Sequence, residues 1–167
     1  MKYLIVVEGS DISSLAYSYK RALENKSENV QIFSLSNSIS RNHPIQFLPK
    51  IISNFINGHF EPKTTIHKAN VELTKFIIKA EIDIVFCFTN SPINPSTIVY
   101  LRSIGKKCIL IYPDAIINMG IRNSLNVKCF NSIYSYSKIG IKSFNLLGAE
   151  NVFWCPLAGD NDIHQLN

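Results

Sequence analysis

Short runs of consecutive hydrophobic residues recur along the chain and are separated by segments with helical spacing. The most marked run is Ile82 to Thr89, and another extends from Lys107 to Tyr112. Neighbouring residues of a strand point to opposite faces of a sheet, so consecutive apolar residues indicate strands that are covered on both faces. Further segments of strand character occur at residues 3–7, 30–35, 131–136 and 152–155. The pattern therefore predicts buried strands, spaced along the whole chain.

Helical periodicity appears between these runs. One long helix is expected to deliver the chain into the Ile82 strand, because its apolar residues recur every three or four positions. They are Ile66, Ala69, Leu73, Ile77 and Ala80. A shorter helix is expected after that strand, with Asn94 as its N-cap, Pro95 at its first position and Gly105 as its left-handed stop.

Other segments are assigned by the same signals. A helix is predicted after Ser13 or Ser14, a second over 48–56, and a third between Ser137 and Gly148. The polar stretch from Ser36 to Pro44 is interpreted as an exposed loop.

The alternation of strands and helices predicts an α/β fold with three layers and a mostly parallel, Rossmann-like sheet. Crossovers between parallel strands are right-handed, so the loops that follow the strands are expected to meet at one edge of the sheet. We expect the strands to lie in the order in which they occur in the sequence. With 167 residues, 46% of them hydrophobic, the chain can bury one good core. A single domain is expected over 1–157, with 158–167 as the start of a linker or tail.

The polar residues at this edge are the candidate site, because open α/β sheets bind ligands at the carboxyl ends of their strands. Asp114 follows the Lys107 strand and could bind a substrate hydroxyl or act as a base. The candidate substrate-binding residues are Glu8, Gly9 and Ser10 after the first strand, and Asn90, Ser91 and Asn94 after the Ile82 strand. Each has a structural alternative: Asp114 could cap the next helix, Glu8 could pair with a lysine, and the remaining residues are common turn formers.

The net charge of +5 comes mainly from lysines and arginines scattered over predicted helix surfaces. Such charges usually form a solvated face, and attraction to an anionic membrane surface or to a phosphorylated substrate is the functional alternative. No dense basic run with interleaved aromatic residues occurs, so nucleic acid is not an expected partner.

The cysteine and histidine spacing predicts neither a metal site nor a disulfide framework. Each of the four cysteines lies in or beside a predicted strand, without a C-x-x-C pair, which is typical of buried, reduced thiols. They are Cys87, Cys108, Cys129 and Cys155. The turn after the first strand lacks the G-x-G-x-x-G spacing of a dinucleotide site, and no cofactor is expected. The first apolar run is interrupted by Glu8, too early for a secretory signal or a membrane span, so a cytoplasmic location is expected.

Two parts of the sequence resemble a known family. The strand from Ile82 is followed by a helix that opens with Asn94-Pro95-Ser96-Thr97, and the next strand ends in Pro113-Asp114. The second half continues with Asn131 to Tyr136, then Leu147-Gly148-Ala149, and then the segment Cys155 to Asp160, which contains Pro-Leu-Ala-Gly-Asp. This order of elements resembles the amino-terminal domain of GT-B glycosyltransferases, in particular CgeB-like and spore-maturation-type proteins, with wider similarity to family 4.

The resemblance implies an acceptor-binding half of a glycosyltransferase. The nucleotide-sugar donor would bind through a second domain that this sequence does not contain, so the chain is expected to be inactive alone. The acceptor could be a glycan, a lipid-linked molecule or a protein, and peripheral membrane contact is a further expectation. The resemblance also implies that Asp160 lies in the turn between the two domains.

Two other functions are kept open. A flavodoxin-like or receiver-like regulatory module would need an acidic cluster after the first strand, and Glu8 with Asp11 gives a weak version of it. A non-catalytic module that binds a partner protein would leave an exposed apolar patch.

Overall fold

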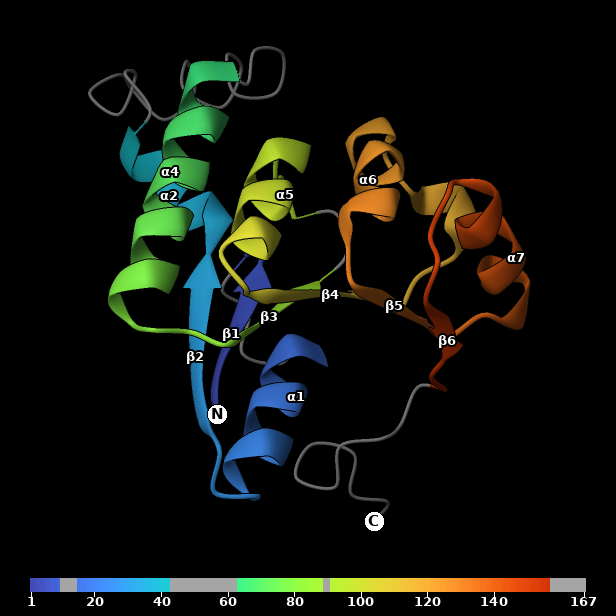
Figure 1. The fold of residues 1–167 in the computed structure, drawn as a ribbon, viewed down its shortest axis with the longest axis horizontal. Coiled ribbons are helices and arrows are strands. Elements are labelled where there is room, and N and C mark those ends of the chain that lie inside the picture. Colours follow the sequence, from blue (N-terminus) through green and yellow to red (C-terminus); the bar gives the residue numbers. More distant parts are fainter. Residues whose placement is uncertain (10–14, 43–62, 89–90, 157–167) are drawn as a thin grey trace, which may run out of the picture.

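Six parallel strands form one sheet in the computed structural model, which describes residues 1–9, 15–42, 63–88 and 91–156 (Figure 1). The strands are β1 (Lys2–Val7), β2 (Asn29–Ser34), β3 (Ile84–Phe88), β4 (Lys107–Tyr112), β5 (Ser132–Ser135) and β6 (Val152–Trp154). All neighbouring pairs are parallel. The predicted α/β class and the six predicted strands are confirmed.

The spatial order of the strands differs from the prediction. The order is β2-β1-β3-β4-β5-β6, so the expectation that the strands follow the sequence order was wrong. The chain moves to one side of β1 to form β2, then crosses back over β1 to form β3. A right-handed crossover can place the next strand on either side of β1. The hydrophobic pattern of a single strand or helix does not reveal which side is used. The reversal creates a topological switch point between β1 and β3.

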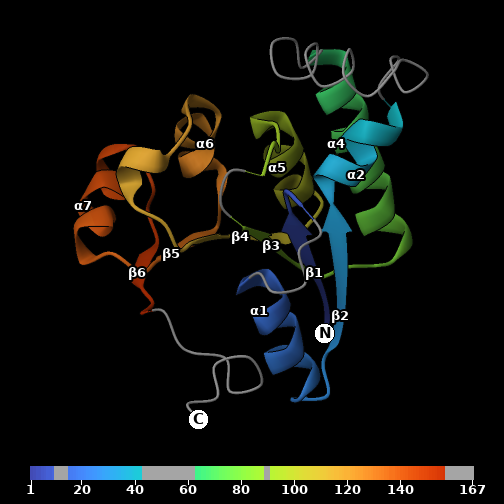
Figure 2. The same cartoon turned by 180° about the vertical axis from the view of Figure 1, so that it is seen from behind.

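Helices cover the two faces of the sheet unequally (Figures 1 and 2). Helix α1 (Leu15–Glu24) packs on the face formed by residues such as Ile5, Phe88 and Ile111. The other helices lie on the opposite face, over the larger core that contains Leu4, Val85 and Leu110. They are α2 (Leu35–Asn42), α4 (Lys63–Lys79), α5 (Pro95–Ser103), α6 (Ile121–Asn126) and α7 (Lys138–Leu146), with the short 3-10 turns η1 (Ile116–Asn118) and η2 (Val127–Cys129).

The prediction of an exposed loop from Ser36 to Pro44 was wrong as far as Asn42, because these residues form α2. Leu35 and Ser38 are buried, and the hydroxyl of Ser38 donates a hydrogen bond to Glu72 of α4. A serine therefore occupies a position where the sequence pattern would require an apolar residue. Helix α6 was also not predicted. The helix expected over 48–56 lies outside the described residues.

The predicted helix ends are mostly confirmed. Pro95 is at the start of α5, and Gly105 and Gly148 have the left-handed φ angles of +81° and +89° after α5 and α7. The Ser137 hydroxyl caps α7 by accepting a hydrogen bond from the backbone nitrogen of Gly140. Asn94 occupies the N-cap position of α5, but its side chain makes no capping hydrogen bond.

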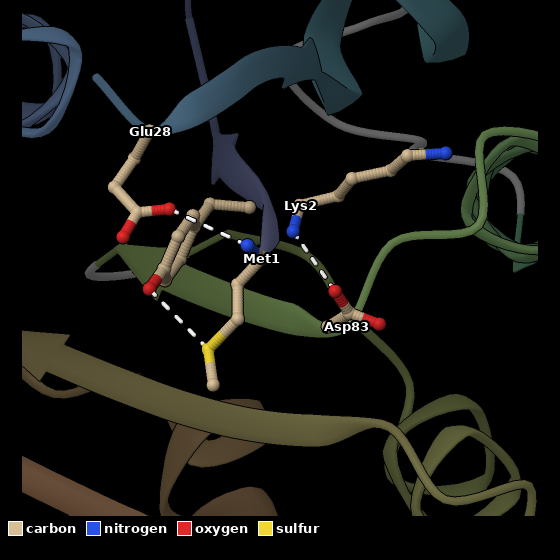
Figure 3. Close-up of polar contacts among 5 residues, drawn as sticks. Met1, Lys2, Glu28 and Asp83 are labelled. Atoms are coloured by element: carbon tan, nitrogen blue, oxygen red, sulfur yellow. Dashed lines mark hydrogen bonds and ion pairs between the residues drawn. The ribbon is translucent and has the colours of Figure 1, made fainter.

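Charged groups at the amino edge of the sheet tie the first strand to its neighbours (Figure 3). The backbone nitrogen of Lys2 donates a 2.9 Å hydrogen bond to the Asp83 carboxylate beside β3. The terminal amine of Met1 lies 3.5 Å from the Glu28 carboxylate beside β2. These contacts connect the start of β1 to the starts of β2 and β3. They have a structural role and lie at the edge of the sheet opposite to the candidate site.

Three of the four cysteines are buried, as predicted, and all four are free thiols. Burial raises the pKa of the Cys108 thiol to about 12 and that of the Cys87 thiol well above its usual range. Cys155 is only half-buried, so the description as a core residue was wrong for this position. Cys155 follows β6, which is the strand at one end of the sheet.

Candidate functional site

The loops that follow β1, β3 and β4 lie at the carboxyl edge of the sheet. The strand register sets Val6 beside Cys87, and Phe88 beside Ile111, so these three strands end side by side. We call the described residues that follow them, Glu8, Gly9, 91–94 and 113–118, the rim. Two of the predicted site residues, Ser10 and Asn90, lie outside the described residues.

Asp114 is held by its own turn. One carboxylate oxygen accepts a 2.7 Å hydrogen bond from the backbone nitrogen of Ala115 and a 2.8 Å bond from the side-chain amide of Asn118. The N-cap position of η1 is Ala115, so Asp114 orients the turn from one residue earlier. Within the described part of the chain, its second oxygen accepts no hydrogen bond. The half-buried carboxylate is therefore oriented by two donors and keeps one oxygen for a further partner.

The predicted residues of the loop after β3 mainly serve its backbone. The buried Ser91 hydroxyl donates to the carbonyl of Phe88 at 2.6 Å, so it closes the turn. The backbone nitrogen of Asn94 donates to the side-chain oxygen of Asn70 on α4 at 2.9 Å. The half-buried side chain of Asn94 remains at the start of α5, where it could meet a ligand.

Two buried asparagines that sequence reasoning missed hold this loop from both sides. Asn70 also donates to the carbonyl of Pro92 at 3.0 Å. From α6, the Asn126 side chain donates to the carbonyl of Ile93 at 2.7 Å, while its own side-chain oxygen is buried and finds no hydrogen-bond partner among the described residues. The position of Asn70 was a usable signal, because it stands four residues after Ile66 on the apolar stripe of a predicted helix. A polar residue there indicates a buried hydrogen bond.

The residues after β1 form an exposed part of the rim. Glu8 and Gly9 are exposed, and a side-chain carbon added to Gly9 would meet no atom within 4 Å. The Glu8 carbonyl accepts a 2.9 Å hydrogen bond from the backbone nitrogen of Ser36, which fixes the main chain at the start of α2. Among the described residues the Glu8 carboxylate makes no ion pair, so the alternative of pairing with a lysine is not observed.

A cluster of tyrosines flanks the rim on the side of α1. Tyr19, Tyr112, Tyr134 and Tyr136 line a narrow hollow together with Cys155. Burial, followed by the hydrogen bond and charge of Cys155, raises the pKa of Tyr19 to about 12. Burial, then the charges of Asp114 and Tyr136, raises the pKa of Tyr112 to about 12 as well. Tyr19 and Tyr112 therefore stay neutral at physiological pH and serve as hydrogen-bonding and packing groups.

The described rim offers polar groups that suit a hydroxyl-bearing ligand. Asp114 offers one free carboxylate oxygen, Glu8 offers an exposed carboxylate, and Asn94 offers a side-chain amide. No group of three or more histidine, cysteine, aspartate or glutamate side chains in the described ranges is placed to hold a metal ion. None of the helices described here is long and apolar enough to cross a membrane.

A parallel sheet with helices on both faces and a switch point between β1 and β3 defines a Rossmann-like domain. No protein-family model matches the sequence, and no curated protein matches it. Among solved structures, the crystal structure of MurG from Acinetobacter baumannii is similar, with a TM-score of 0.61 and 10% sequence identity. The alignment covers 95% of this chain and 46% of the MurG chain. The three layers and the all-parallel sheet are consistent with a Rossmann-like half of a GT-B fold, and the chain spans less than half the length of MurG.

Proposed function

We propose that this chain is the acceptor-side half of a GT-B glycosyltransferase. The observation that carries this proposal is the likeness to MurG, which extends over nearly the whole chain and over less than half of the other protein. The sequence resemblance to the amino-terminal domains of CgeB-like and family 4 enzymes supports the same assignment. In this proposal residues 1–157 are the acceptor-side domain, and 158–167 lead toward a donor-binding domain.

The rim is the surface that would face the donor across the cleft. In the proposed reaction an acceptor hydroxyl oxygen forms a bond to the anomeric carbon of the sugar, and the bond from that carbon to the nucleotide diphosphate breaks. Asp114 would accept the hydroxyl proton through its free oxygen, because the other oxygen is occupied by Ala115 and Asn118. Glu8 and Asn94 would hydrogen-bond other acceptor hydroxyls.

The proposal is tested by titrating the purified chain with nucleotide-sugars and by assaying transfer. The expected result is weak or undetectable nucleotide-sugar binding and no transfer, because the donor contacts would lie in the second domain. Joining the chain to a donor-binding domain should restore transfer. Transfer by the 167-residue chain alone would contradict the half-enzyme assignment, and tight nucleotide binding without transfer would favour a nucleotide-sensing module.

One observation favours a second candidate, a flavodoxin-like binding module. The strand order β2-β1-β3-β4-β5 matches that of flavodoxin-like proteins, with β6 added at one end. Such proteins bind a flavin at the switch point between β1 and β3. Titration with flavin mononucleotide separates the two candidates: saturable binding with quenched flavin fluorescence would favour this module over the glycosyltransferase half.

A further inference from the structure

Strand β2 is one of the two outermost strands of the sheet. The strand order places β1 on one side of it, and within the described part of the chain no strand pairs with its other side. Figures 1 and 2 show β2 beyond β1, away from β3 and β4. Alternate residues of an outermost strand direct their backbone N–H and C=O groups away from the sheet, so β2 offers a row of hydrogen-bonding groups to a further strand.

The features that usually protect an outermost strand are not found in β2. Such strands are commonly short, carry charged residues or proline, or contain a β-bulge. Strand β2 has six residues, and none of them is charged or a proline. Its register with β1 runs without interruption from Asn29 to Ser34, so it contains no bulge. The opposite outermost strand, β6, has only three residues, and Pro156 follows it two positions later.

The side chains of β2 leave apolar surface open at this side of the sheet. Ile32 packs against the core that α1 covers, and Phe33 packs on the other face against Phe76 of α4, with ring centres 5.5 Å apart. Both Ile32 and Phe33 are only half-buried. A hollow of about 650 Å³ is lined by these three side chains, by Ser34 and by Arg41 of α2. An added strand would occupy part of this hollow and cover Ile32 and Phe33.

A second copy of β2 is complementary to the first when the two strands run antiparallel. A two-fold axis perpendicular to the sheet, passing through Gln31, places the start of one β2 opposite the end of the other. Opposite residues of an antiparallel pair lie on the same face of the sheet. Val30 of one copy then lies opposite Ile32 of the other, so two apolar side chains of the face covered by α1 come into contact.

The charges that flank β2 favour the same arrangement. Glu28 directly precedes the strand, and Arg41 lines the hollow beside the end of the strand. In the antiparallel pair Glu28 of one copy therefore comes near Arg41 of the other, twice in the dimer. Their contacts within the chain are long and exposed, 3.5 Å from Glu28 to the amine of Met1 and 3.9 Å from Arg41 to Glu72. Ion pairs of this kind are weak, so both charges can also attract an opposite charge on another molecule.

We propose that the chain forms a two-fold symmetric dimer in which the β2 strands of two copies pair antiparallel, joining their sheets into one. Backbone hydrogen bonds hold the two strands together, while the Val30–Ile32 contacts and the flanking charges set their direction and register. A second copy supplies an uncharged strand of equal length with a carboxylate at one end and a guanidinium at the other, which is the complement of this side of the sheet. The inference is independent of the proposed glycosyltransferase function, because dimerisation requires neither donor nor acceptor and β2 does not contribute to the rim.

The test is sedimentation equilibrium of the full chain at micromolar concentrations. The expected mass is that of a dimer, twice the 18.9 kDa of one chain. Asn29→Lys adds a cation at an exposed position of β2, near Arg41 of the other copy in the dimer. It should raise the dissociation constant roughly tenfold or more, because the symmetric dimer contains this repulsion twice. Asn145→Lys makes the same change at an exposed position of α7 and should leave the dissociation constant nearly unchanged.

Exchanging the two flanking charges tests the direction of the strands. Glu28→Arg and Arg41→Glu should each weaken the dimer about fivefold or more, because each variant brings like charges together. The double variant Glu28→Arg/Arg41→Glu restores opposite charges and should recover most of the affinity. Hydrogen exchange reports on the backbone, and alternate amides of β2 should exchange more slowly at high protein concentration than at low. Circular dichroism verifies that every variant is folded.

The proposal is overturned if the chain stays monomeric, if Asn29→Lys and Asn145→Lys weaken the dimer equally, or if the charge exchange gives no recovery. Assemblies larger than a dimer that Phe153→Lys disperses would overturn it as well. Phe153 is 48% exposed on β6, and pairing of β2 with β6 of the next copy would give open chains without a closing symmetry. The proposed glycosyltransferase half is tested separately, by transfer after a donor-binding domain is joined to the chain.

Discussion

The side-chain oxygen of Asn70, in the middle of α4, accepts a hydrogen bond from the backbone nitrogen of Asn94, 24 residues further along the chain. The nitrogen of the same side chain donates to the carbonyl of Pro92, and Asn126 reaches the carbonyl of Ile93 from α6. Three successive residues of the rim are thus held by two buried amides from different helices. The loop after β3 is therefore fixed by the core rather than by its own turn chemistry alone.

Asn70→Leu should destabilise the protein although the two side chains are similar in size. The substitution leaves the Pro92 carbonyl and the Asn94 nitrogen without partners, and each unsatisfied buried group costs about 1–3 kcal/mol. Urea denaturation should show a loss of roughly 2–4 kcal/mol. Lys75→Leu, at an exposed position of the same helix, is the control and should change stability little. Equal stability of Asn70→Leu and wild type would show that the loop does not depend on this side chain.

Asn126→Asp should make stability depend on pH in a way that identifies its donor role. A protonated carboxyl can still donate to the Ile93 carbonyl, whereas an ionised one cannot and is costly to bury. The pKa of the introduced group would be raised in the folded state above the unfolded value of about 3.9. The variant should therefore approach wild-type stability below about pH 4 and lose stability as pH rises above it. Asn145→Asp, exposed on α7, should show no such dependence in parallel urea titrations.

Alkaline pH should destabilise the protein through Tyr112, which is buried, and Tyr19, which is half-buried. Burial raises the pKa of Tyr112 and of Tyr19 from 10.0 to about 12, so the folded state favours the neutral phenols. Their contribution is fully present below pH 10 and is lost as pH rises from 10 toward 12. Tyr112→Phe should reduce this alkaline decrease and cost about 1 kcal/mol at neutral pH, for the lost hydrogen bond to Ala115. Tyr100→Phe, on the exposed side of α5, should leave the alkaline decrease unchanged in the same denaturation series.

Thiol labelling should separate Cys155 from the other three cysteines. A thiol-reactive dye applied to the native protein is expected to modify Cys155 first, because it alone is not buried. Cys155→Ala should remove the fast phase and leave the slow one. Fast labelling of Cys155→Ala would show that the core opens more readily than the packing indicates.

The strands were predictable because their signal is local. Runs such as Ile82 to Thr89 place apolar side chains on both faces of a strand. Such a strand is best buried in the middle of a parallel sheet, where helices cover both faces. The helix ends at Gly105 and Gly148 were predictable for the same reason, since a left-handed residue is needed there. Helix α2 was missed because Ser38 is buried by a bond to Glu72, a partner 34 residues away. The strand order was missed because it depends on the direction of each crossover.

The candidate site was predictable only as an edge of the sheet. The topology brings the loops after β1, β3 and β4 together, but the role of each side chain depends on neighbours that are remote in the sequence. Ser91 was selected as a ligand contact, and in the structure its hydroxyl donates a hydrogen bond to the Phe88 carbonyl, a role that the sequence did not indicate. Asn70 and Asn126 were not selected, although they fix the backbone of the rim. Polar residues on apolar helix stripes are therefore as informative as those in loops.

Asp114→Asn is the substitution that tests the chemistry proposed for the rim, in an enzyme that joins this chain to a donor-binding domain. The amide oxygen can still accept from Ala115 and Asn118, so the turn should persist and stability should change little. A carboxylate that takes the acceptor proton cannot be replaced by an amide, so turnover should fall roughly a hundredfold or more with a smaller change in KM. Asn118→Ala is the matched control, because it removes one orienting hydrogen bond and leaves the carboxylate, and its effect on turnover should be smaller. If Asp114→Asn retains full turnover, Asp114 is a turn residue and the base lies elsewhere, whereas a joint loss of stability and activity would show that its bonds to η1 are its main role.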